Sequence, residues 1–114
     1  MGIDHYAFMT YSTEHELDST FLDEYHSKNV DHNELPVVFD GAWDKMHIGL
    51  VLFETGSIRD GASVTKNYVV DPENVKGLLQ ARDKYQSLFV ETFPGFANLL
   101  DGEWRIRSFV VMDA

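Results

Sequence analysis

The sequence predicts an α+β domain on the basis of three observations. Apolar residues alternate near both ends of the chain, over 3–11 and 104–112, which is typical of strands. Two segments, 13–28 and 72–92, carry apolar residues at helical spacing. Short apolar runs lie between them. The β-α-β-β-α-β (ferredoxin-like) order fits best, a two-layer sandwich in which an antiparallel sheet packs against two helices.

The first strand and helix follow from local patterns. In the strand over 3–11, every second residue is apolar or aromatic on one face, and aromatic residues on the other face indicate partial burial of both. Thr13 to Glu16 then matches a capping box, which predicts the helix N-terminus at Thr13. Leu17, Phe21 and Tyr25 follow at intervals of four and form one apolar stripe. The helix is therefore expected over 13–28.

The middle of the chain contains one ambiguous segment. The run at 35–39 is short and β-branched, and Asp40-Gly41 predicts a turn after it. Segment 42–53 fits either a buried strand over 46–53 or a helix. Gly49 costs a helix about 1 kcal/mol relative to alanine, which favours the strand. Alternation predicts another strand over 63–70.

Clear signals mark the second helix. Asp71-Pro72-Glu73 combines an N-cap acid, a proline at the first helical position and a further acid, which predicts a helix start. Apolar residues keep the helical period to about residue 92, where Phe93-Pro94-Gly95 ends the helix.

The final strand, 104–112, carries Arg105 and Arg107 on one face. Alternate cations on an exposed strand discourage edge-to-edge pairing.

Composition indicates one domain over residues 1–114. The chain is 44% hydrophobic and 13% aromatic, enough for a single core without disulfides. It has no cysteine, which excludes thiolate metal sites and cysteine nucleophiles. We also expect no membrane-spanning segment, no signal peptide and no cofactor, and a cytoplasmic location.

The negative charge is concentrated in the first part of the chain. The net charge is −10, and residues 1–44 contain ten acidic residues against one basic residue, Lys28. An acidic surface repels phosphate, so direct nucleic-acid binding is not expected. It attracts basic protein surfaces with salt-sensitive association. A solvated acidic surface that serves only solubility is the plain alternative.

We therefore expect a non-enzymatic binding protein. It would be an inhibitor, immunity-type or anti-defence protein that masks a basic surface of a toxin, nuclease or defence effector. Imitation of a nucleic acid by its carboxylates is one form of such masking. The sequence is also compatible with a homodimer. Acidic residues would supply the charge and aromatic residues the anchors. The candidate partner-binding residues are Tyr11, Glu14, Asp18, Asp23, Tyr25, Asp31, Glu34, Asp40, Trp43 and Asp44.

The alternative is a small enzyme or ligand-binding domain with a pocket around Trp43 and His47. His47 lies in an apolar stretch with Asp44 nearby, where an imidazole can serve as a general base or as a structural group. No nucleophile elbow or phosphate-binding loop supports catalysis, so no catalytic residue is assigned. Histidine and acid pairs three residues apart supply two ligands each, too few for a metal site, and no metal is expected.

The stretch from Phe39 to Leu50 resembles a segment of the YfbM-like family of uncharacterised bacterial proteins, which has the pattern Asp-x-x-Trp-x-x-(Leu/Met)-His-x-x-Leu. The opening Met1-Gly2 and the segment from Tyr68 to Lys76 are also similar. The resemblance covers about half of the chain. It implies a helical Trp–His segment and no known reaction, and it draws attention to Trp43 and His47.

Overall fold

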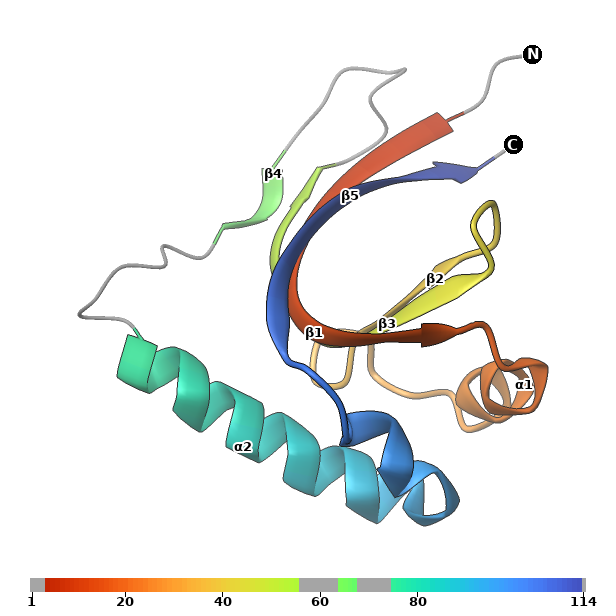
Figure 1. Ribbon diagram of the computed structural model, residues 1–114, viewed down its shortest axis with the longest axis vertical. Coiled ribbons are helices and arrows are strands. Elements are labelled where there is room, and N and C mark those ends of the chain that lie inside the picture. Colours follow the sequence, from red (N-terminus) through yellow and green to blue (C-terminus); the bar gives the residue numbers. More distant parts are fainter. Residues whose placement is uncertain (1–3, 56–63, 68–74, 114) are drawn as a thin grey trace.

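The computed structural model describes residues 4–55, 64–67 and 75–113. It confirms the α+β class (Figure 1). In chain order the elements are β1 (Asp4–Glu16), α1 (Ser19–Ser27), β2 (Val37–Asp40), β3 (Lys45–Thr55), β4 (Val64–Asn67), α2 (Val75–Thr92), the 3-10 helix η2 (Pro94–Leu100) and β5 (Arg105–Asp113).

The strands form one antiparallel sheet in the order β2-β3-β1-β5, and β4 also pairs with β3. Because β1 occupies one edge of β3, both β2 and β4 lie along its other edge. β1 and β5 run together and bend strongly (Figure 1). The chain has one more strand than predicted and a 3-10 helix after α2, so the ferredoxin-like order is not confirmed.

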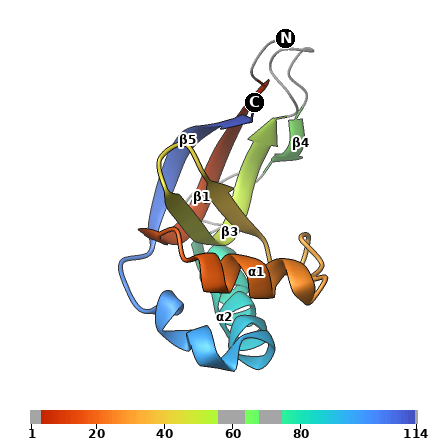
Figure 2. The ribbon, with the colours of Figure 1, turned by 90° about the vertical axis from the view of Figure 1, so that its right-hand side faces the viewer.

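The two helices and η2 lie on the same side of the sheet (Figure 2). Their aromatic residues form the core with the sheet face above them. Met46 and Ile48 from β3 are fully buried there. His47, between them, therefore faces the opposite side of the sheet. The other core residues are Phe21, Tyr25, Leu35, Val37, Tyr85, Phe89, Phe93, Leu99 and Leu100.

The predicted start of the first helix at Thr13 is wrong. β1 continues to Glu16, and Thr13 is buried, where its hydroxyl donates to the Leu99 carbonyl at 2.9 Å. The helix begins at Ser19, and the carboxylate of Asp18 accepts hydrogen bonds from the amides of Thr20 and Phe21. A long-range contact of Thr13 thus overrides the local capping pattern.

The ambiguous segment is a strand, because β3 spans Lys45–Thr55. The helical Trp–His segment implied by the resemblance is therefore wrong. Gly49 allows β3 to approach β1 closely, because a Cβ at this position would clash with the Tyr11 carbonyl oxygen. Of the predicted strand 63–70, β4 covers Val64–Asn67. The predicted helix start at Asp71-Pro72-Glu73 lies outside the described residues.

Candidate functional site

The turn between β2 and β3 presents Trp43 to solvent. The pair Asp40 and Lys45 closes the hairpin, and Asp44 adopts a positive φ of 51° in the turn. The Leu17 amide donates to the Asp44 carbonyl at 2.8 Å, which ties the turn to the chain that follows β1. Trp43 is 69% exposed in this turn. A large exposed aromatic on a fixed turn is typical of a protein-binding anchor.

Carboxylates lie beside this turn. The register of β1 with β3 places Glu14 opposite His47 and Glu16 opposite Lys45. Glu16 accepts a hydrogen bond from Lys45 at 2.6 Å, which raises the pKa of that lysine. Glu14 lies 3.5 Å from Arg107, so two of the acidic groups have cationic neighbours. Asp44 itself is exposed within the turn.

The other acidic candidates lie on α1 and the loop after it. Asp18 is occupied as the N-cap of α1. Asp23 is exposed on the helix. In the loop, Asp31 accepts a hydrogen bond from the Asn33 amide at 2.9 Å, and Glu34 is exposed. The predicted carboxylates thus extend from the hairpin turn along α1 to this loop.

Three predicted partner contacts have structural roles instead. Tyr25 is 1% exposed, and its hydroxyl donates to the Leu35 carbonyl at 2.8 Å. Burial raises the pKa of Tyr25 to about 12. Asp40 is 4% exposed, so neither residue is accessible to a partner. Tyr11 is half-buried, and its hydroxyl accepts a hydrogen bond from Arg82 at 3.0 Å.

His47 lies on the sheet face away from the helices. It is 6% exposed, and its ring stacks on Phe109 of β5 with centroids 3.9 Å apart. Burial lowers the pKa of His47, and the cations Arg107 and Lys45 act in the same direction against the acids Glu14 and Asp40. Trp43 is exposed in the turn whereas His47 is buried in the sheet, so the two side chains lie in different environments.

Two buried polar atoms on His47 and Asp40 are unusual. Among the described residues, neither Nδ1 of His47 nor Oδ1 of Asp40 has a hydrogen-bond partner. On β1, the hydroxyls of Thr10 and Ser12 are also buried and lie 2.7 Å apart. Buried polar atoms are normally paired, so this pair of atoms is a candidate ligand or water site. The sequence could not show it, because strand register brings Asp40 and His47 into this environment.

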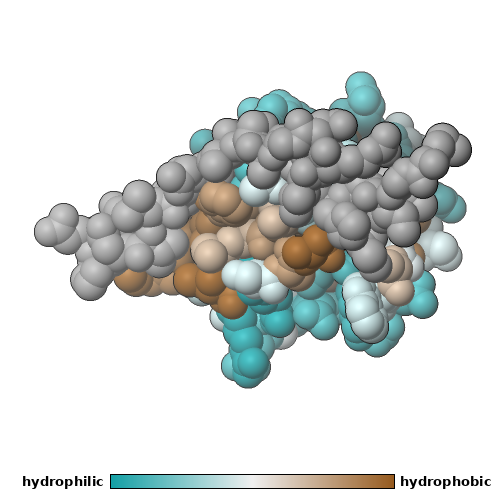
Figure 3. Space-filling view, turned by 90° about the horizontal axis from the view of Figure 1, so that it is seen from above, coloured by the Kyte–Doolittle hydropathy of each residue, from teal (hydrophilic) through white to brown (hydrophobic). Residues whose placement is uncertain are grey.

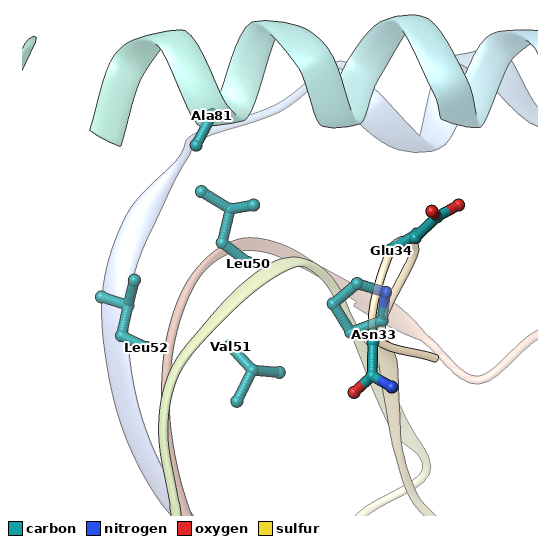
Figure 4. Close-up of a pocket in the computed structure, with 7 residues that line it drawn as sticks. Asn33, Glu34, Leu50, Val51, Leu52 and Ala81 are labelled. Carbon is teal, nitrogen blue, oxygen red and sulfur yellow. The ribbon is translucent and has the colours of Figure 1, made fainter. Parts of the chain in front are cut away.

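The sequence analysis also missed a pocket of about 170 Å³ on the outer edge of β3. Its walls come from three separate parts of the chain, namely the loop before β2, the middle of β3, and α2 (Figure 4). The one sequence signal for this pocket was Pro36, because a proline lacks the amide hydrogen that regular strand pairing requires. The lining residues are Asn33, Glu34, Pro36, Leu50, Val51, Leu52 and Ala81.

No group of three or more histidine or acidic residues in the described parts of the chain is placed to hold a metal ion. None of the helices in the described ranges is long and apolar enough to cross a bilayer.

No family model, curated protein or solved structure matches this chain. The likeness to the YfbM-like family therefore stays a prediction.

Proposed function

We propose that this chain is a non-enzymatic binding protein of the inhibitor or immunity type, which masks a basic surface of a toxin, nuclease or defence effector. The observation that carries the proposal is Trp43, 69% exposed on a fixed turn with carboxylates beside it. The net charge of −10 supports a basic partner. More specifically, we propose that the exposed carboxylates form a row that imitates the phosphates of a nucleic acid.

The aromatic and acidic groups have different parts in this binding. Tryptophan is enriched among residues whose truncation costs an interface 2 kcal/mol or more. Exposed carboxylates contribute mainly to the rate of association and to its salt dependence. Burial of Trp43 therefore supplies most of the affinity, whereas Asp44 and its neighbours select basic partners.

The test is capture of a partner by immobilised protein, from lysates of the source organism and of its competitors, at low and high salt. We expect a stoichiometric basic protein that is released as salt rises. Trp43→Ala should weaken binding by more than about tenfold. Neutralising Glu16, Asp23 and Asp44 together, as Gln, Asn and Asn, should slow association. Asp18 is left intact because it caps α1.

Glu91→Gln is the matched control, because Glu91 is exposed on α2. It should bind like the wild type. If Trp43→Ala and the triple variant also bind like the wild type, the partner uses another surface and the proposal is wrong. Absence of any basic partner at either salt would equally contradict it.

A second candidate function has one observation in its favour. His47 Nδ1 and Asp40 Oδ1 are buried without partners among the described residues, as in a site that awaits a small polar ligand. In that case the chain would be a ligand-binding domain or small enzyme. A ligand screen by NMR should then shift the His47 ring signals in the wild type. If no ligand shifts these signals, the two buried atoms are a hydrated structural feature and this second function is wrong.

A further inference from the structure

Strands pair with the outer edge of β3 at both of its ends. β2 pairs with Lys45 to Ile48, and β4 pairs with Phe53 to Thr55. Residues 49–52 have no strand beside them on this edge in the described parts of the chain. The pocket of about 170 Å³ lies at this interruption.

Pro36 and Tyr85 fix the pocket at the end next to β2. Proline has no amide hydrogen, so β2 cannot extend past it as a regular ladder. The hydroxyl of Tyr85 from α2 donates instead to the Pro36 carbonyl at 2.6 Å. A buried side chain thus replaces the missing strand pairing. The pocket is therefore a built feature of the fold and not a loose gap.

The walls of the pocket are chemically divided. Leu50, Leu52 and Ala81 supply apolar surface, and Leu50 and Ala81 point toward one another (Figure 4). Asn33 and Glu34 stand across the pocket from the leucines (Figure 4). Glu34 is exposed, and none of the lining residues within the described parts of the chain carries a positive charge. One side is thus apolar, and the other carries Asn33 and Glu34, with the Glu34 carboxylate at the outer rim and directed away from the leucines (Figure 4).

We infer that this pocket binds a single lysine or arginine side chain from a partner protein. The aliphatic stem of such a side chain suits the leucine wall, while its charged head reaches the carboxylate at the rim. The volume is below the ~300 Å³ at which sites for drug-sized molecules begin, so one side chain is a fitting occupant. The basic occupant complements both Glu34 and the net charge of −10.

This inference rests on the proposed function and adds a second contact to it. The four residues of β2 separate the pocket from the turn that carries Trp43, a distance of roughly 13 Å at ~3.3 Å per residue. One partner surface can therefore reach both. Trp43 would anchor the partner at one end of β2, and the pocket would select a basic residue at the other.

Short blocked peptides test the pocket without the natural partner. A peptide with one central lysine among alanines is titrated into isotope-labelled protein and followed by amide NMR shifts. We expect shifts at Val51, Leu52 and Ala81. A matched peptide with norleucine in place of lysine keeps the stem but lacks the charge, and it should bind about two- to fivefold more weakly.

Three variants make the assignment specific. Glu34→Gln should weaken the lysine peptide by about two- to fivefold and leave the norleucine peptide unchanged. Ala81→Leu should fill the pocket and abolish binding of both peptides, with an unfolding midpoint near that of the wild type showing that it folds. Glu91→Gln, on the same helix as Ala81, should leave the binding of both peptides unchanged.

The outcomes separate this inference from the proposed function. Equal binding of the lysine and norleucine peptides would make the pocket a purely apolar site and overturn the basic occupant. Absence of shifts at the pocket amides would overturn the site altogether. Trp43→Ala should leave peptide binding intact while it weakens capture of the whole partner, so either claim can fail without the other.

Discussion

Gly49 is the single residue on which the path of β3 depends most. Its φ is +155°, and a Cβ would lie 2.7 Å from Ser12 Cα and 2.8 Å from Trp104 Cζ3. These neighbours are a backbone and a packed ring, so neither can yield easily. Gly49→Ala should therefore lower the free energy of unfolding by about 2–4 kcal/mol, measured by urea denaturation.

Gly41→Ala is the control for this substitution, because nothing lies within 4 Å of a Cβ at that position. It should stay within about 0.5 kcal/mol of the wild type. Equal stability of the two variants would show that Trp104 does not pack on Gly49 as described.

Tyr25 makes stability sensitive to alkaline pH. Burial raises its pKa from 10.0 to about 12, and burial also holds the pKa of Tyr85 well above its usual value. The folded state favours the neutral phenol, so this stability is present below pH 10 and is lost as pH rises toward 12. For Tyr25 alone the loss is on the order of 3 kcal/mol.

Denaturation followed between pH 9 and pH 11.5 checks this expectation. Tyr25→Phe should be less stable than the wild type at pH 9, by about 1–3 kcal/mol, because the Leu35 carbonyl loses its donor. It should also lose less stability on going to pH 11.5. A variant with the same alkaline slope as the wild type would contradict the assignment to Tyr25.

At the scale of elements, α1 depends on Asp18 and not on the pattern that first marked its start. The Asp18 carboxylate accepts hydrogen bonds from the Thr20 and Phe21 amides at 2.9 and 3.3 Å. Asp18→Ala should lower the free energy of unfolding by about 1 kcal/mol, whereas Asp18→Asn should retain most of it. Thermal unfolding of both variants decides the matter, and equal losses would exclude a capping role.

Periodic patterns predicted the existence of elements better than their ends. Alternation found β1 and β5, and the helical period found α2, because the packing that selects these residues is regular. The end of β1 was missed because Thr13 bonds to Leu99, a residue far along the chain. No local pattern encodes such a contact. The strand favoured over 46–53, where Gly49 disfavours a helix, is confirmed and lies within β3, Lys45–Thr55.

The candidate site was only partly readable from the sequence. Exposed Trp43 and Asp44 could be proposed from a turn signal and charge. The burial of Tyr25 was indicated by its place on the apolar stripe of the helix, although it was also proposed as a partner contact. The burial of Asp40 was not readable, because it depends on which face of β2 packs inward. The pocket beside Leu50 joins three distant segments. Sites of that kind follow from tertiary packing, which residue spacing does not report.

At the scale of the whole molecule, the long strand β5 lies at the edge of the sheet. β5 pairs with β1, and the described residues place no strand on its other side. Ile106 and Val110 on β5 are 49% and 45% exposed. Apolar residues also gather near the middle of the face seen from above (Figure 3). Such an edge favours pairing with another chain unless charges oppose it.

Arg105 is the residue on β5 that best opposes such pairing. Its side chain is 58% exposed and lies 2.6 Å from Glu103, so the strand begins with a hydrated ion pair. Arg105→Val should remove this charge, extend the apolar edge toward Ile106, and increase self-association. Sedimentation velocity over a range of protein concentrations should then give a higher average mass than for the wild type. Arg105→Lys keeps the charge and should match the wild type. If Arg105→Val associates no more than Arg105→Lys does, hydration of Arg105 is not what protects the β5 edge, and the twist of the strongly bent sheet would have to account for its protection instead.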